Sequence, residues 1–475
     1  MNKYQSIDIN KAKYFTITTK IVIIFAIIST MVTFIQRDKS PNGYENMWLL
    51  PLSYGILFYC TKIRQTFFKY IGISILNLIL FVRYLILPIF SSLTGLYFHS
   101  FAIRTDGYVN SLSILLMIYE MICIFLVLHY AIKRLDRQQI KMYNDIKLVC
   151  DTNFGVYKVA ILIGIVSFLY IPEIQERTNF LLVNDFQYNN LNAISYVGFL
   201  FTTNALKVFF LFILSIRYEK RRKGYKKNQF LILFFAFLNI SVFWSTNRLT
   251  IVAQGLATIA ILKASNMINR KLSYILITIT ILIVLSLSSY RWFGYGKLNT
   301  FYDDSGYYFD DNQMTSNYLQ AYFGGPHLIS TAINTKEKQS FGTKLEAFPN
   351  EIFSSILFVR QLIPLSENSS TKSFNKKFGF SESTSMILPT LGQSYMYFGI
   401  FGAPLLSVIF CLFLYKAEKA IIKCKNIGER YAYYILVIWL AFFPMQNLNI
   451  VSASFFNVFL PFYLIVVANK RFKIG

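Results

Sequence analysis

The sequence predicts an all-α membrane protein that crosses the bilayer about twelve times, with both termini in the cytoplasm and one large external loop. Of the 475 residues, 55% are hydrophobic and only 15% are charged, whereas a soluble domain carries about 25% charged residues. Apolar runs recur along the chain, with lengths near the roughly 20 residues that a helix needs to cross a bilayer. Short clusters rich in Lys and Arg separate several of these runs, for example RYEKRRKGYKK at residues 217–227.

The predicted transmembrane helices form two groups, one in residues 1–289 and one in residues 386–475. The helices of the first group are expected at 20–36, 47–61, 69–90, 111–132, 158–172, 197–216, 229–246, 249–263 and 272–289. Those of the second group are expected at 391–415, 431–446 and 448–468. Residues 290–385 then form the large external loop between the ninth and tenth helices.

The distribution of basic residues predicts the orientation. With the N-terminus inside, most of the 47 Lys and Arg residues fall in cytoplasmic segments, as the positive-inside rule requires. The same distribution accounts for the formal charge of +24 without a nucleic-acid partner, because a basic patch indicates nucleic-acid binding only on a soluble face. The lipid bilayer is therefore the expected partner.

The large external loop is rich in Tyr, Phe, Ser and Asn and holds nine of the 23 acidic residues. Its aromatic content favours an ordered structure, because disordered segments contain few aromatic residues. Within it, Glu351–Ile363 (EIFSSILFVRQLI) places apolar residues on one helical face. This pattern predicts an amphipathic helix that lies along the membrane surface.

Charged residues inside predicted transmembrane helices are candidates for function, because a charge in the bilayer is costly. Arg83, Glu120 and Lys207 are expected about 10, 14 and 15 Å below the external ends of their helices. Arg248 and Arg291 are expected at the external ends of two others. One interpretation is an outward-facing pocket that binds a lipid diphosphate, since Arg binds phosphate oxygens in pairs. The other is that Arg83 or Lys207 pairs with Glu120 to hold helices together, while Arg248 and Arg291 are interfacial residues.

Several residues of the external loop are further candidates. His327 follows Gly324-Gly325-Pro326, where the glycines would allow the backbone to approach a ligand and the histidine could be a general base toward a sugar hydroxyl. The alternative is that His327 has only a structural role. Tyr322 and Arg360 are expected to contact substrate. Additional loop carboxylates could supply an acid or base, but their spacing singles out none of Glu346, Glu351 and Glu382.

The sequence predicts no metal site and no cofactor. The five cysteines lack the spacing of a metal site, and the acidic cluster near Asp310 lacks the regular spacing of an EF-hand loop. Nucleotide-binding and soluble-hydrolase motifs do not occur in a usable context.

Two stretches give the sequence a family resemblance. These are Tyr318–Pro326 (YLQAYFGGP) and Leu388–Gly402 (LPTLGQSYMYFGIFG), together with Asn247-Arg248 at an external helix end. With the order of predicted helices and the long external loop, they resemble the Wzy-type family, the oligosaccharide repeat-unit polymerases of bacterial O-antigen and capsule assembly. Family members often carry Asp before the Phe-Gly pair, where this chain has Tyr397, so no acid or base role transfers to that position.

The resemblance implies a membrane glycosyltransferase of the bacterial cytoplasmic membrane. Its substrate would be an oligosaccharide on undecaprenyl diphosphate at the outer face, and it would transfer the growing chain onto a new lipid-linked unit. Arg248, Arg291 and Arg83 would hold the diphosphate, and His327 or a loop carboxylate would take the acceptor proton. A flippase and a chain-length regulator of the same pathway would be partners.

Two other functions remain open at this point. A ligase would move finished polysaccharide from the same lipid onto another acceptor. A lipid-oligosaccharide flippase or transporter would need charges near the middle of the membrane and would have little need of a long external loop. The predicted charges lie in the external half, which favours external chemistry.

Overall fold

The computed structural model describes an almost entirely helical protein, as the sequence predicts. The described residues are 3–66, 69–98, 105–142, 148–151, 153–182, 192–224, 229–244, 248–293, 311–335, 341–377 and 386–472. Within these ranges six helices are long and apolar enough to cross a membrane, or seven if one bent pair counts as a single crossing. Three shorter apolar helices accompany them. These features fit a multi-pass membrane protein, while the number of twelve crossings stays a prediction.

The helices of residues 1–293 follow the predicted apolar runs, with differences at their ends. They are α1 (Lys3–Ile35), α2 (Leu49–Cys60), α3 (Ile71–Phe81), α4 (Leu87–Thr94), α5 (Gly107–Met142), α6 (Gly155–Tyr170), α7 (Pro172–Glu176), α8 (Ala193–Arg222), α9 (Gln229–Ser241), α10 (Arg248–Ala264) and α11 (Arg270–Phe293). The short helices of this part are η1 (Arg37–Lys39), η2 (Lys62–Gln65) and η3 (Val82–Ile86). The π-helical turn η3 joins α3 to α4, so that one continuous helical segment, long and apolar enough to cross a membrane, runs from Ile71 to Thr94. We call such segments crossings.

The described part of the external loop predicted at 290–385 contains several helices joined by turns. They are α13 (Asp311–Phe323), α14 (Pro326–Thr335), α15 (Phe341–Phe353), η5 (Val359–Gln361) and α16 (Ser370–Lys377). The last part of the chain forms α17 (Thr390–Gly402), α18 (Leu405–Lys423), α19 (Ile427–Ala441), η6 (Phe443–Met445), α20 (Leu448–Ala453), η7 (Ser454–Phe459) and α21 (Leu460–Arg471).

Three predicted helices differ from the structure. The helix predicted at 391–415 is divided into α17 and α18, which meet at 107° across Ala403 and Pro404. Helix α17 is itself kinked at Gly399, whose φ of 72° and ψ of −164° are a conformation almost restricted to glycine. The helix predicted at 229–246 ends at Ser241, where β2 (Val242–Phe243) pairs with β1 (Asn179–Phe180). The amphipathic helix predicted at Glu351–Ile363 is not continuous, since α15 ends at Phe353 and turns follow.

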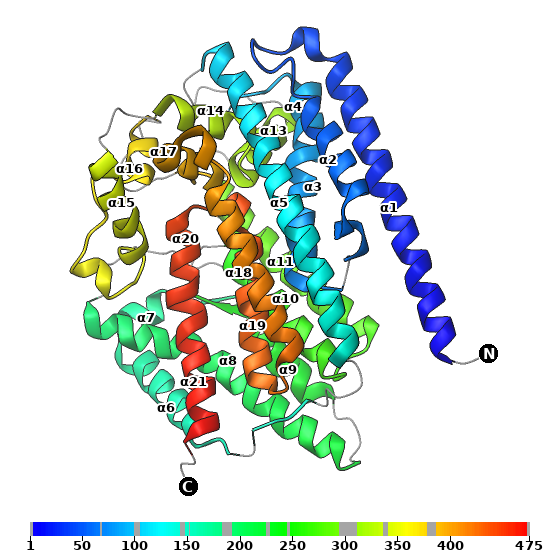
Figure 1. Cartoon of the computed structure of the whole chain (residues 1–475). Helices are drawn as coiled ribbons and strands as arrows, with labels where there is room; N and C mark the ends of the chain where they lie inside the picture. Colours follow the sequence, from blue (N-terminus) through cyan, green and yellow to red (C-terminus); the bar gives the residue numbers. More distant parts are fainter. Residues whose placement is uncertain are drawn as a thin grey trace.

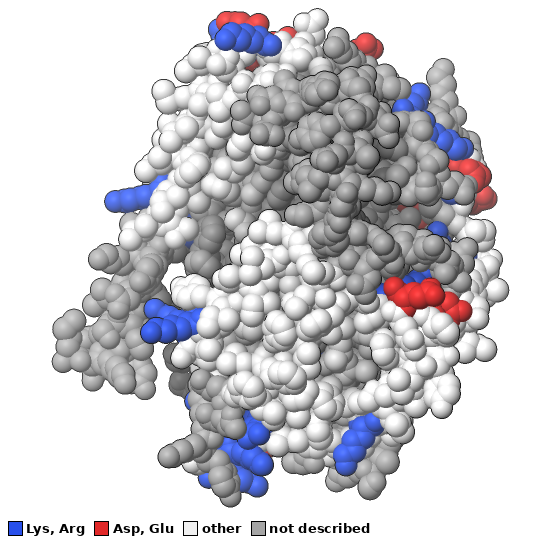
Figure 2. All heavy atoms as spheres, turned by 180° about the vertical axis from the view of Figure 1, so that it is seen from behind, with Lys and Arg blue, Asp and Glu red and all other residues white. Residues whose placement is uncertain are grey.

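Segments predicted to be cytoplasmic meet at one end of the bundle. Val149 donates its backbone N–H to the carbonyl of Lys425 over 2.8 Å, and Lys470 forms an ion pair with Glu429 at 2.9 Å. Helix α1 begins and α21 ends in the lower half of the view in Figure 1. Figure 2 shows Lys and Arg side chains at this lower end, beside a broad surface with few charges. The shared end agrees with the positive-inside pattern, while its cytoplasmic location stays a prediction.

Segments predicted to be external meet at the opposite end, where α13, α14 and α17 lie (Figure 1). The Tyr44 hydroxyl lies 3.3 Å from Oγ of Ser330, and the Tyr44 ring stacks on Tyr97 with 5.5 Å between centroids. Ser316 in α13 donates to the carbonyl of Leu96 over 3.0 Å. We call this the outer end. The described helices of the large loop are thus packed onto the bundle.

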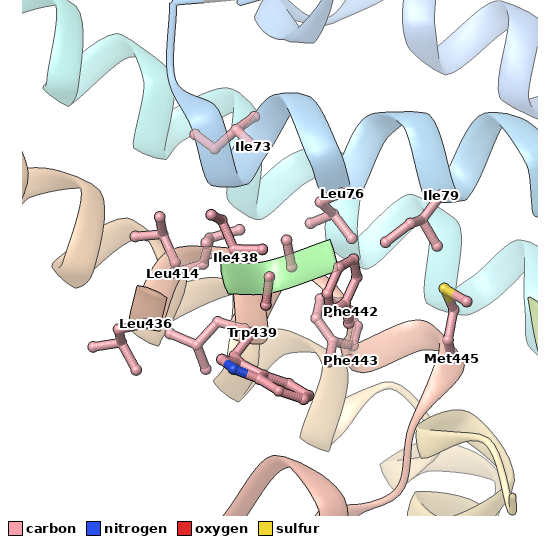
Figure 3. Packing of buried hydrophobic residues seen from close by; sticks show 14 of the residues in the cluster. Ile73, Leu76, Ile79, Leu414, Leu436, Ile438, Trp439, Phe442, Phe443 and Met445 are labelled. Atoms are coloured by element: carbon pink, nitrogen blue, oxygen red, sulfur yellow. The ribbon is translucent and has the colours of Figure 1, made fainter. Parts of the chain in front are cut away.

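The hydrophobic core lies between the crossing helices. In Figure 3, Leu76 and Ile79 of α3 point toward Phe442, Phe443 and Met445, at the end of α19 and in η6. Leu414 of α18 and Ile438 and Trp439 of α19 belong to the same buried cluster. Burial of such residues between helices fixes the relative positions of α3, α18 and α19. Arg83 lies in η3, directly after α3, and Ser407 of α18 contacts Glu120.

Candidate functional site

Arg83 lies deeper in the bundle than its sequence position predicts. It sits in η3, near the middle of the crossing Ile71–Thr94. Eleven residues separate it from Thr94, which corresponds to about 16 Å at 1.5 Å per residue. The prediction of about 10 Å was too shallow because the helix continues four residues beyond the expected end at 90.

Arg83 and Glu120 form a buried ion pair. Nη1 of Arg83 lies 3.1 Å from Oε2 of Glu120, and both side chains are fully buried. The hydroxyl of Tyr84 also donates to Oε2 at 3.2 Å, and Ser407 donates to Oε1 at 2.5 Å. The carboxylate therefore joins η3, α5 and α18. This geometry agrees with the alternative interpretation of the sequence, in which Arg83 pairs with Glu120 to hold helices together.

Lys207 is buried in α8 and bonds within its own helix. Its Nζ donates to the carbonyl of Thr203 at 3.2 Å and lies 3.4 Å from Oδ1 of Asn204. Among the residues that the structure describes, Lys207 forms no ion pair with Glu120. The two cations of the predicted pocket thus have different partners, and the structure does not combine them into one site.

Arg248 and Tyr322 are brought together at the outer end. The guanidinium carbon of Arg248, the first residue of α10, lies 5.1 Å from the centroid of the Tyr322 ring in α13. A cation at this distance is attracted by the negative face of the ring. Tyr318, one turn earlier in α13, stacks on Tyr322 with 6.4 Å between centroids. The arginine therefore stands beside two partly buried tyrosines, a combination suited to phosphate and sugar groups.

The charge of Arg248 also acts on Tyr318. Burial raises the pKa of Tyr318, the Tyr322 phenol raises it further, and Arg248 lowers it. The guanidinium thus favours negative charge in its surroundings. This is the electrostatic property that a site for an anionic leaving group needs.

The Gly324-Gly325 turn positions Tyr322. Gly324 has φ +62°, and a side-chain carbon there would lie 2.9 Å from the carbonyl oxygen of Pro444 in η6. Gly325 donates its N–H to the carbonyl of Gln320 at 3.0 Å, and a side-chain carbon on it would collide with the Gln320 amide. The two glycines were expected to allow approach of a ligand. In this structure the glycines instead allow close contact with Pro444 and Gln320 of the same chain, and they fix the end of α13.

The structure places the other predicted candidates, His327, Arg291 and Arg360, on three different elements, α14, α11 and η5. His327 is fully buried in α14, and its ring meets Phe98 edge-on at 5.2 Å. Such burial does not suit a base that must reach a sugar hydroxyl. The backbone of Arg291 lies in the last turn of α11, while its side chain is outside the described part of the structure. Arg360 is exposed in η5.

Glu351 is a buried carboxyl that the sequence did not single out. Its Oε1 accepts from Oγ of Ser370 at 2.8 Å and from the N–H of Thr371 at 3.0 Å, and its Oε2 accepts from Gln393. Oε1 of Gln393 in turn accepts the N–H of Leu448 at 2.6 Å. Burial raises the pKa of Glu351, and its hydrogen bonds oppose that rise. The carboxyl ties α15 and α16 to α17 and α20, and no local pattern in the sequence indicates this arrangement.

An apolar groove of about 430 Å³ lies at the outer ends of α6 and α8. Its lining residues are Ile163, Ser167, Ile171, Ile194, Val197, Gly198 and Phe201. With one hydroxyl and otherwise apolar walls, the groove offers no group for acid, base or phosphate chemistry. Of the features described, the contact of Arg248 with Tyr322 is therefore the candidate functional site.

Comparison of the chain with family models, curated proteins and solved structures finds no match.

Proposed function

We propose that the protein is a membrane glycosyltransferase that polymerises undecaprenyl-diphosphate-linked oligosaccharide units at the outer face of the bacterial cytoplasmic membrane. The observation that carries the proposal is the position of Arg248 over the Tyr322 ring at the outer end. An arginine there can bind a diphosphate, and neighbouring tyrosines can stack on sugars. The resemblance of residues 318–326 and 388–402 to the Wzy-type family is the second support.

The proposed reaction transfers a glycosyl group without a nucleotide. A hydroxyl oxygen of the acceptor sugar forms a bond to the anomeric carbon of the donor chain, and the bond from that carbon to the diphosphate oxygen breaks. The bonding electron pair remains on undecaprenyl diphosphate, and the acceptor hydroxyl gives up its proton. Arg248 would stabilise the charge that develops on the diphosphate, as a preorganised cation does. No residue is assigned to take the proton, because His327 and Glu351 are both buried.

The test is a gel of purified protein incubated with one undecaprenyl-diphosphate-linked repeat unit, without nucleotide or added metal. A ladder of products spaced by one repeat is the expected result. Single repeats that persist with the native substrate would contradict polymerase activity. If long preformed chains were instead transferred to a second acceptor, a ligase function at the same site would replace the proposed polymerase function.

A second candidate function is movement of the lipid-linked oligosaccharide across the membrane. It is supported by the depth of the Arg83–Glu120 pair, because charges near mid-membrane are typical of transport pathways. A flippase reconstituted into vesicles would carry a fluorescent lipid-linked oligosaccharide between leaflets. Retention of the label in one leaflet, together with a polymer ladder, would favour the glycosyltransferase.

A further inference from the structure

The segment that follows α15 carries apolar side chains on its surface. We call residues 353–363 the turn segment. Four of its large apolar side chains are exposed, with exposed fractions of 48% for Phe353, 54% for Phe358, 82% for Leu362 and 41% for Ile363. Arg360, also exposed, lies among them. Such a cluster on a single segment indicates contact with a partner or with a membrane.

The turn segment is bound to the side of the last crossing. Asn457, in the π-helical turn η7, accepts the backbone N–H of Leu357 at 3.2 Å and donates to the carbonyl of Ser355 at 2.8 Å. In Figure 1 the segment is drawn in yellow beside α20. Asn350, which precedes the turn segment, donates its side-chain amide to the carbonyl of Pro364, which follows it, at 3.1 Å. This bond links the two ends of the segment. The segment is therefore held at a defined height on the crossing.

That height lies within the predicted hydrocarbon layer. The crossing runs from Leu448 to Arg471, and Lys470 and Arg471 at its far end are suited to the opposite interface. Asn457 follows Leu448 by nine residues, or about 14 Å at the helical rise. Since the hydrocarbon layer is about 30 Å thick, the contact with Asn457 is well inside it.

Most backbone N–H groups of the turn segment are hydrogen-bonded within the protein, which favours its placement in lipid. Unbonded backbone groups are costly in hydrocarbon, so a non-helical segment must satisfy them within the protein. Seven of its N–H groups donate to protein acceptors, those of Ser354, Ser355, Ile356, Leu357, Arg360, Leu362 and Ile363. Asn457 supplies the acceptor for Leu357, which lies between the local turns.

We infer that the turn segment is inserted into the lipid leaflet at the outer end, with Phe358, Leu362 and Ile363 among the hydrocarbon chains. Its partner is the bilayer itself, and the long side chain of Arg360 can extend from the segment toward the outer interface. This placement is deeper than the surface helix predicted from the sequence. It does not depend on the proposed glycosyl transfer.

The test measures the depth of a nitroxide label in vesicles of phosphatidylethanolamine and phosphatidylglycerol. Cys60 is exposed and Cys123 is partly exposed, so the background is Cys60→Ser with Cys123→Ser, and the label is placed at Leu362→Cys. The matched control is Lys376→Cys in α16, a site that is also exposed but belongs to a polar helix. The label at 362 should collide more often with oxygen, which concentrates in hydrocarbon, than with a water-soluble nickel chelate. The label at 376 should show the reverse.

Equal access of the nickel chelate to both labels would overturn the inference. A second variant tests the anchor, since Asn457→Ala removes both hydrogen bonds to the segment. In that variant the label at 362 should become more mobile and more accessible to nickel. An unchanged label depth would overturn the role given to Asn457.

Discussion

Nη1 of Arg83 lies 3.1 Å from Oε2 of Glu120, and neither side chain has any exposed surface. Glu120 accepts hydrogen bonds from Tyr84 and Ser407, so each of its carboxylate oxygens has a hydrogen-bond partner. Removal of one partner from such a pair leaves an isolated charge in a medium of low dielectric constant, which costs more than the pair contributes. The two residues should therefore behave as a unit.

The first prediction concerns this pair. Arg83→Met should destabilise the protein by about 3–5 kcal/mol, the range measured when one partner of a buried pair is removed. Arg83→Met combined with Glu120→Gln should be more stable than Arg83→Met alone, because the second substitution removes the charge left without a partner. Thermal unfolding in detergent measures both. The control is Lys372→Gln, which breaks the exposed pair with Glu367 and should change the midpoint little. A double variant no more stable than the single one would contradict the pairing.

The second prediction compares two glycines that share a left-handed backbone. Gly324 has φ +62° and Gly95 has φ +68°, but only Gly324 has an atom within 4 Å of where a side chain would begin. Alanine at either position should cost about 1–2 kcal/mol of backbone strain. Gly324→Ala should lower the unfolding midpoint further, since its new carbon would press on the Pro444 carbonyl. Equal losses in the two variants would mean that η6 can move away from α13.

The sequence predicts the helical class and most helix positions, because long apolar runs suit few structures other than membrane helices. It does not predict features that depend on distant partners. The apolar pattern at 351–363 suggests a helix, but Asn457, far along the chain, supplies hydrogen bonds that allow a turn instead. Arg248 and Tyr322 are both candidates from the sequence, yet their contact requires the packing of α13 near the start of α10. The depth of Arg83 was underestimated because an apolar run does not mark where a helix ends.

The third prediction follows from the buried carboxyl of Glu351. Burial raises its pKa above the usual 4.5 in the folded protein. A raised pKa means that the folded state binds the proton more tightly, so the carboxyl stabilises the fold most below pH 4.5 and progressively less as the pH rises through the raised value. In Glu351→Gln this contribution is absent. The unfolding midpoint of the wild type, relative to the variant, should therefore fall from about pH 4.5 upward and then level off.

A control for Glu351 is available in the same helix. Glu346 also lies in α15 but is exposed, and Glu346→Gln should keep the pH dependence of the wild type. A constant difference between wild type and Glu351→Gln at all pH values would show that burial does not perturb this carboxyl.

The fourth prediction concerns the proposed site. If Arg248 stabilises the leaving diphosphate, Arg248→Ala should slow formation of the polymer ladder by roughly 10²-fold, the loss expected when one preorganised stabilising group is removed. Arg248→Lys should restore only part of the rate, because an ammonium lacks the planar, paired donors of a guanidinium. Tyr322→Phe keeps the ring beneath the guanidinium and should remain active, whereas Tyr322→Ala should not.

The readout must separate a direct role of Arg248 from a structural one. Thermal midpoints of the four variants identify any loss of fold, and Lys376→Ala, an exposed basic residue of α16, controls for a change of surface charge. A direct role predicts a lower turnover in Arg248→Ala at an unchanged midpoint. Wild-type polymer from a stable Arg248→Ala protein would exclude Arg248 from the reaction, and the diphosphate would then have to be bound by another cation of the outer end.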